Sequence, residues 1–159
     1  MAKSSIQIKG LSIRKASDKD LQKITRLKAE FLGTPLRKKN VDFLPRRLVD
    51  KMDTVFVAEL DGKLAGFVWT GMFYDNTGEL QGIGVRKKFR GKEIGGALQA
   101  RAIEHLAEQG YKYIGSYPTT IEGKRLLMKI TQKRLKNPMT NRKMPGQHFW
   151  RAKRPARRR

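Results

Sequence analysis

One stretch of the sequence decides the fold: Glu79-Leu80-Gln81-Gly82-Ile83-Gly84-Val85-Arg86-Lys87-Lys88-Phe89-Arg90-Gly91-Lys92-Glu93-Ile94-Gly95-Gly96-Ala97-Leu98. Residues 79–85 have the half-apolar pattern of a strand, and from Ile94 onward apolar residues recur at helical spacing. A basic, glycine-rich turn lies between them, at the point where the first backbone N–H groups of the helix have no acceptor within the helix. The helix dipole and the cations of the turn both favour an anion, so this segment is predicted to bind phosphate oxygens.

The turn carries the spacing Arg90-x-x-Glu93-x-Gly95, which is similar to the acetyl-CoA-binding motif Gln/Arg-x-x-Gly-x-Gly/Ala of the GNAT superfamily of N-acetyltransferases. Glu93 stands where the family usually has glycine, and it adds a negative charge near the expected pyrophosphate. If φ is positive there, it also adds strain of roughly 1–3 kcal/mol. The resemblance implies that acetyl-CoA is the cofactor and that a backbone N–H near Val85 stabilises the oxyanion. The implied cofactor-binding residues are Ile83, Val85, Arg90, Gly91, Lys92, Glu93, Gly95 and Gly96.

The expected elements also follow the order of that family, over roughly residues 11–137. They are a strand at 11–16, a helix from 21, a short helix around 43–52, a hairpin of 54–60 and 63–70, a strand at 79–85, a helix at 92–109, a strand at 111–117 and a helix from about 120 to 137. The resemblance implies an α/β fold with a mixed central sheet, splayed strands and flanking helices. We expect a single domain over residues 1–150 and a basic tail over 151–159.

Acetyl transfer to an amine requires a group that removes a proton from the ammonium form. Glu79 is the candidate, because strand alternation predicts that it shares a face with Gln81, Ile83 and Val85. It also precedes the motif at the spacing at which similar histone-type lysine acetyltransferases carry their glutamate base. Many family members protonate the leaving thiolate with a tyrosine on the last helix, where this sequence has Leu127 or Met128. Tyr117 is the substitute candidate. The alternatives are a solvated, salt-bridged Glu79 and a core or surface Tyr117.

The net charge of +22 is concentrated at one end of the chain. No acidic residue follows Glu122, whereas 14 basic residues do. Like charges at helical spacing repel one another unless a polyanion relieves them, so this region is predicted to contact nucleic acid. The candidate residues are Arg125, Lys129, Lys133, Lys136, Arg151, Lys153, Arg154, Arg157, Arg158 and Arg159.

Several classes of site are excluded by composition. The chain has no cysteine and only two histidines, so neither a disulfide nor a metal site is predicted. No apolar run approaches the length of a membrane span or a secretory signal. We therefore expect a cytoplasmic protein, with ribosome or nucleoid association open, and no membrane partner.

Three functions are compatible with the sequence. The first is an acetyl-CoA-dependent N-acetyltransferase of a protein amine, a lysine or an N-terminus, held on nucleic acid or a ribonucleoprotein by its basic end. The second is a non-catalytic protein of the same fold that serves as a structural or assembly component bound to ribosomal RNA. The third is an acetyltransferase of an acidic small molecule or peptide, steered by the positive field.

Overall fold

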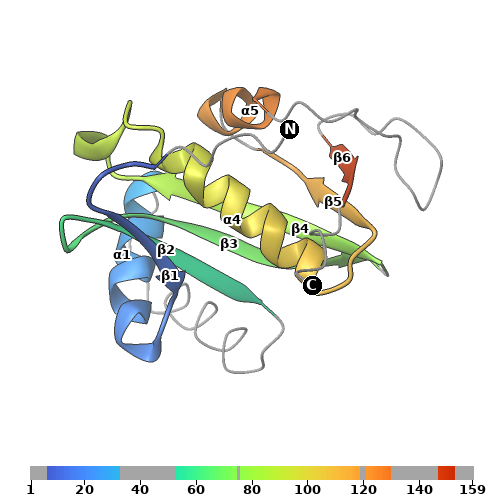
Figure 1. Ribbon diagram of the computed structural model, residues 1–159, viewed down its shortest axis with the longest axis horizontal. Helices are drawn as coiled ribbons and strands as arrows, with labels where there is room; N and C mark the ends of the chain where they lie inside the picture. The colour runs from blue at the N-terminus through green and yellow to red at the C-terminus, as the bar shows by residue number, and fades with distance from the viewer. Residues whose placement is uncertain (1–6, 33–52, 75, 119–120, 130–146, 153–159) are drawn as a thin grey trace.

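The computed structural model describes residues 7–32, 53–74, 76–118, 121–129 and 147–152, which form a mixed sheet flanked by helices (Figure 1). The sheet has the order β1-β2-β3-β4-β5-β6. Every neighbouring pair is antiparallel except β4 and β5, which run parallel. The strands are β1 (Leu11–Lys15), β2 (Thr54–Leu60), β3 (Lys63–Tyr74), β4 (Thr77–Val85), β5 (Tyr113–Ser116) and β6 (His148–Arg151). The expected α/β architecture is thereby confirmed.

The hairpin of β2 and β3 forms where the sequence predicts it. Asp61 and Gly62 both have positive φ, 50° and 73°, as a tight hairpin turn requires. β3 extends to Tyr74, four residues beyond the expected end, because its second half pairs with β4 across another turn at Asn76. The long β3 therefore supports the whole of β4, which carries the phosphate-binding turn at its end.

Two helices cover opposite faces of the sheet, because alternate residues of each strand point to opposite sides. α1 (Leu21–Leu32) packs Ile24 and Leu27 against one face. α4 (Ile94–Glu108) packs Leu98 and Leu106 against the other face, which includes Phe56. Each face of the sheet thus has its own apolar core, and α4 is held rigidly across β2, β3 and β4.

The last described helix, α5 (Ile121–Met128), lies beside α4 (Figure 1). It begins where the sequence predicts a helix, and the remainder of that expected helix lies outside the described residues. The short helix expected around 43–52 also lies outside them. Short 3-10 helices at Asp18–Asp20 and Lys87–Phe89 precede α1 and α4.

β6 closes the far edge of the described sheet against β5. Phe149 and Trp150 are buried in it, so they anchor the chain to the domain and do not offer a stacking surface. Arg151, assigned above to the tail, pairs with Tyr113 within this strand. The backbone N–H of Ala152 donates to the carbonyl oxygen of Lys112. The contacts of the sheet therefore extend to Ala152.

Candidate active site

The site begins where β4 and β5 separate. The parallel pairing joins only Thr77–Leu80 to Tyr113–Ser116, so the last five residues of β4 have no β5 residue opposite them. A cavity of about 570 Å³ opens at this point, and residues 80–85 form one wall. Backbone groups on this edge of β4 can therefore bond a ligand that lies in the gap like an added strand.

A β-bulge shapes this edge of β4. Trp69 pairs with Gly82 and Thr70 with Leu80, so Gln81 is the extra residue. Because of it, Leu80 and Ile83 both pack on the α4 face although they are three residues apart. Glu79, next to Leu80, therefore points to the opposite face.

The bulge places Glu79 on a different face of β4 from the one that strand alternation predicts. Glu79 was expected to share a strand face with Ile83 and Val85, on the assumption of unbroken alternation, and that assumption is wrong. Glu79 is half-buried and lies opposite Gly71 and Gly115. It does not line the cavity, whereas Gln81 does.

The turn between β4 and α4 has the form of an anion cradle. Gly91 has a φ of 77°, and no described atom lies within 4 Å of the position that its Cβ would take. Arg90 donates its Nε–H to the carbonyl oxygen of Val85 at 3.0 Å, which ties the turn to the strand. The first bond of α4 runs from the Ala97 N–H to the Glu93 carbonyl, so the N–H groups of the three preceding residues have no acceptor within the helix.

Glu93 occupies the N-cap position of α4 with a φ of 59°, in the left-handed region. The positive φ at this position strains the backbone, because glutamate rarely adopts it whereas glycine adopts it freely. Its side chain makes no capping hydrogen bond. Instead, both carboxylate oxygens lie 3.4 Å from the Nζ of Lys129, just beyond the end of α5.

Most of the residues selected from the motif line the cavity. They are Ile83, Val85, Arg90, Gly91, Glu93, Gly95 and Gly96. Lys92 belongs to the turn, is exposed and is not part of the wall. The structure thus brings the strand edge and the helix start together at one cavity.

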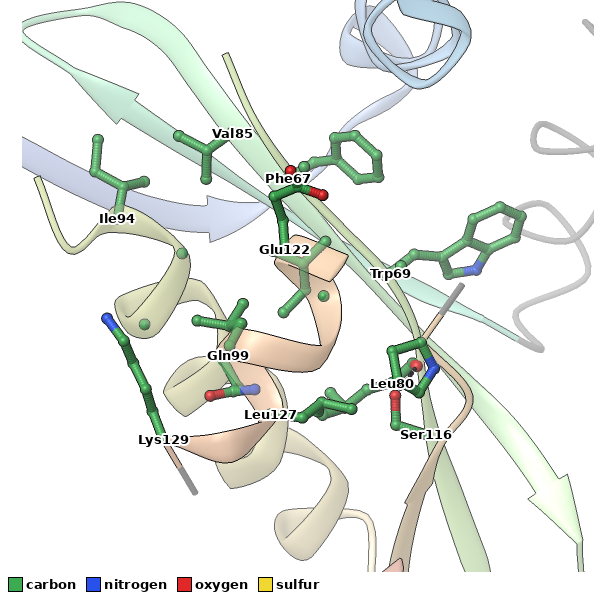
Figure 2. A pocket seen from close by; sticks show the side chains of 18 of the residues that line it. Phe67, Trp69, Leu80, Val85, Ile94, Gln99, Ser116, Glu122, Leu127 and Lys129 are labelled. Carbon is green, nitrogen blue, oxygen red and sulfur yellow. Dashed lines mark hydrogen bonds between the residues drawn. The ribbon is translucent and has the colours of Figure 1, made fainter. Parts of the chain in front are cut away.

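Another part of the wall comes from α4, α5 and the end of β5 (Figure 2). Leu127 is buried there, in the region where the family has its tyrosine. Tyr117 lines the cavity at the end of β5 and is exposed by 53%. The hydroxyl group of the neighbouring Ser116 already has a hydrogen-bond partner, because its Oγ–H donates to the carbonyl oxygen of Leu80 at 3.1 Å. Among the described residues, Ser116 and Tyr117 are the two hydroxyl-bearing residues of the wall.

The face of β3 opposite α4 contributes a separate end of the cavity. Its wall contains Trp69 and Phe67, and the Nζ of Lys28 on α1 lies 4.1 Å from the centroid of the Trp69 ring. Trp69 donates its Nε1–H to Asp53 at 2.8 Å, which fixes the ring. This end is aromatic and cationic, and it is separate from the phosphate turn.

Five polar residues of the wall were not predicted from the sequence, namely Lys28, Gln81, Gln99, Ser116 and Glu122. Glu122 is the second residue of α5, the helix that follows β5 in the chain, and the region after a strand beside a ligand cleft is a position that the sequence could have indicated. Lys28 and Gln99 could not be found in this way, because they lie on helix faces that read as ordinary amphipathic surface. Gln81 is the extra residue of the β-bulge, and a bulge of this kind leaves no pattern in the sequence from which it could be predicted.

The predicted nucleic-acid residues are only partly described. Arg125 and Lys129 are exposed on and beside α5, and Arg151 is exposed on β6. Lys129 also lines the cavity and faces Glu93, so its role is not confined to a basic surface. The other candidates lie outside the described residues: Lys133, Lys136, Lys153, Arg154, Arg157, Arg158 and Arg159.

Comparison with known proteins identifies the class of this site. Residues 21–122 match the profile described as "Acetyltransferase (GNAT) family". A curated "Uncharacterized N-acetyltransferase" of Archaeoglobus fulgidus is 32% identical over 114 residues, which are 64% of this chain and 78% of that protein. The chain therefore belongs to the GNAT acetyltransferase family.

Solved structures agree on the fold. A GNAT-family acetyltransferase from Staphylococcus aureus Mu50 matches with a TM-score of 0.70 and 13% identity, over 90% of this chain and 99% of that one. The PaiA N-acetyltransferase from Thermoplasma acidophilum, in complex with coenzyme A, matches with a TM-score of 0.62 and 16% identity, over 90% and 98%. Further matching acetyltransferases were solved with acetyl-CoA. Acetyl-CoA is thus the cosubstrate of this class.

The residues present fit acetyl-CoA on three observations. The edge of β4 is unpaired where a pantetheine arm would run, Gly91 leaves room at the anion cradle, and the Nε2 of Gln99 is buried without a hydrogen-bond partner among the described residues. Acetyl-CoA supplies an acetyl thioester that an amine can attack. The helix start would hold its pyrophosphate, and backbone N–H groups near Val85 would face the developing oxyanion. The protein is an acetyl-CoA-dependent N-acetyltransferase.

No helix within the described ranges is both long and apolar enough to cross a membrane.

Proposed function

We propose that this acetyltransferase modifies a protein amine, a lysine or an N-terminus, while its basic C-terminal region holds it on nucleic acid or a ribonucleoprotein. The observation that carries the proposal is the charge distribution of the sequence. The chain has a net charge of +22, and no acidic residue follows Glu122. Such a surplus, without counter-charge, attracts a polyanion and keeps a bound protein close to it.

The described residues support a basic surface beside the active site. Lys124 and Arg125 are exposed on α5. Arg125 and Lys129 are four residues apart, so they lie on the same side of the helix as it ends. Glu93 is the acidic partner that the structure gives Lys129, and no described carboxylate is paired with Arg125. A polyanion bound here would lie next to the end of the cavity that holds the phosphate turn.

Two carboxylates are candidates for the group that removes a proton from the acceptor amine. Glu79 is suggested by its spacing before the motif, and Glu122 by its place on the cavity wall. The proposed acid is Tyr117, which lies on the same wall and is accessible to solvent. A water chain can connect a carboxylate outside the wall to the amine, so Glu79 remains a candidate base.

The test uses acetyl-CoA labelled with ¹³C in the acetyl group and intact ribosomes or nucleoid preparations as acceptors. Acetylated peptides are identified by mass spectrometry with and without prior nuclease treatment. The proposal expects label on lysines or N-termini of nucleic-acid-bound proteins, at a rate that falls after nuclease treatment. Label that is confined to small amines or acidic small molecules, or that is insensitive to nuclease, would contradict it.

The non-catalytic alternative does not hold, because the chain belongs to the GNAT acetyltransferase family and its site fits acetyl-CoA.

A further inference from the structure

Gln99 is a buried polar residue on the wall of the cavity. It lies on α4, one helical turn after Gly95 of the phosphate turn, and only 5% of its surface is exposed. Its Nε2 has no hydrogen-bond partner among the described residues. Buried side-chain donors are nearly always paired, and an unpaired one destabilises the protein. The Nε2–H of Gln99 therefore needs a hydrogen-bond acceptor, and a bound ligand can supply one.

The surroundings of Gln99 supply few acceptors of their own. Leu126 and Leu127 of α5 line the same cavity, and Figure 2 shows the carboxamide between α4 and the side chains of Leu127 and Lys129. Neither leucine offers an acceptor atom, and an ammonium group offers none either. An apolar residue at position 99 would suit an empty cavity better than glutamine does.

The distance along α4 indicates which part of acetyl-CoA lies beside Gln99. Four residues of helix advance about 6 Å from Gly95, so Gln99 lies just beyond the site expected for the pyrophosphate. From there the cavity continues along the unpaired edge of β4, where the pantetheine arm would lie. The pantetheine arm carries two amide groups, and each has a carbonyl oxygen that needs a donor when it leaves water.

We infer that Gln99 donates its Nε2–H to an amide carbonyl of the pantetheine arm of acetyl-CoA and so positions the arm between β4 and α5. Gln99 is a positioning residue, since the reacting thioester of a bound acetyl-CoA would lie further along the cavity. The inference rests on acetyl-CoA as the cosubstrate, and it is independent of the acceptor named in the proposed function.

The test compares two ligands that differ by the pantetheine arm. Coenzyme A has the arm, and adenosine 3′,5′-diphosphate retains phosphates and nucleoside but lacks it. Gln99→Met keeps the length of the side chain and removes the donor. We expect its affinity for coenzyme A, measured by calorimetry, to fall about tenfold, as the loss of one buried hydrogen bond implies. Its affinity for adenosine 3′,5′-diphosphate should stay within about twofold of wild type.

Thermal unfolding without ligand distinguishes a role in ligand binding from a purely structural role of Gln99. Removal of an unpaired buried donor should leave the melting temperature unchanged or raise it, while the affinity for coenzyme A falls. Gln109→Met is the matched control, because Gln109 is exposed at the far end of the same helix. It should change neither affinity.

Two results would overturn the inference. One is an unchanged affinity of Gln99→Met for coenzyme A. The other is an equal loss of both ligands together with a lower melting temperature, which would make Gln99 a structural residue. Failure of the wild-type protein to bind coenzyme A would overturn the cofactor site as well, whereas failure to acetylate a protein amine would leave this inference standing.

Discussion

Glu93 and Lys129 join the two helices on either side of the cavity mouth, with 3.4 Å between the carboxylate oxygens and the ammonium nitrogen. Glu93 caps α4 in a left-handed conformation, and Lys129 follows the last residue of α5. Both side chains are largely exposed, so the pair itself adds little stability. Its consequence is electrostatic, since a phosphate bound at the turn would meet the carboxylate and compete with it for Lys129.

Glu93→Gly is expected to improve both stability and cofactor binding. Glycine adopts a φ near 59° without strain, so the free energy of unfolding should rise by about 1 kcal/mol. Removal of the carboxylate also removes repulsion of the pyrophosphate and releases Lys129 to bind it, so the affinity for acetyl-CoA should rise several-fold. Denaturant unfolding and calorimetric titration measure the two effects separately.

Glu93→Asn separates charge from strain, because asparagine tolerates the left-handed region better than most residues and carries no charge. It should reproduce most of the gain in affinity. If both variants bind acetyl-CoA more weakly than wild type, the carboxylate is part of the binding site and the electrostatic interpretation is wrong.

Arg90→Ala is expected to weaken acetyl-CoA binding by at least tenfold. Arg90 contributes positive charge at the turn and also holds the turn to β4 through the Val85 carbonyl. Arg90→Lys retains the charge but lacks the Nε–H donor, so it should recover only part of the affinity. Full recovery by lysine in a calorimetric titration would show that the bond to Val85 does not matter for binding.

The strand-turn-helix at the centre of the fold could be predicted from the sequence because each of its signals is local. Alternation, glycine, cations and helical periodicity all fall within twenty residues, and the structure has β4, the turn and α4 there. The hairpin at Asp61 was equally local. β3 was predicted too short because its second half is stabilised by pairing with β4, which no local pattern records.

The cavity wall was harder to predict than the turn. Glu79 was assigned a face by strict alternation, and a single extra residue at Gln81 reverses that assignment. Gln99 and Lys28 reach the cavity only because α4, α5 and α1 are brought around β4. Such contacts depend on the tertiary arrangement, so period and composition could not show them.

Glu79→Gln and Glu122→Gln will distinguish the two candidate bases. The variant that removes the base should lower kcat at neutral pH by about 10²–10⁴-fold and lose the corresponding limb of the pH–rate profile. The affinity for coenzyme A should be unchanged in either variant, since neither residue belongs to the phosphate turn. A normal profile for both variants would indicate that the amine loses its proton to solvent.

Removal of residues 153–159 tests the basic tail without disturbing β6. The truncation eliminates five cations, so the slope of log affinity against log salt should become shallower by about 0.9 for each lost contact with a duplex phosphate. Fluorescence anisotropy with RNA and DNA duplexes, between about 50 and 200 mM salt, measures the slope. An unchanged slope would show that the tail is not the anchor, and the search would move to Arg125 and Lys129.

His105 should make the stability of the protein depend on pH. It is buried on α4 with its ring edge-on to Phe56, 5.1 Å between centroids. Burial lowers its pKa below the ordinary value, and the charges of Lys15 and Arg101 lower it further, against an opposing effect of Glu108. The neutral form is thus favoured in the folded state, and the unfolded chain binds the proton first as pH falls.

The stability contributed by neutral His105 is therefore complete above a pH of about 6.5 and is lost as pH falls from there toward the lower folded-state pKa. The slope cannot exceed about 1.4 kcal/mol per pH unit for one group. Asp20 does not contribute in this range, because its bonds with Arg14 and Ser17 lower its pKa and its effect begins only below about pH 4. Denaturant unfolding between about pH 7.5 and pH 5 should show the loss in wild type and in His148→Gln, which removes the other histidine. In His105→Leu the free energy of unfolding should depend less on pH over this range. A slope that persists in this variant would assign the effect to another group.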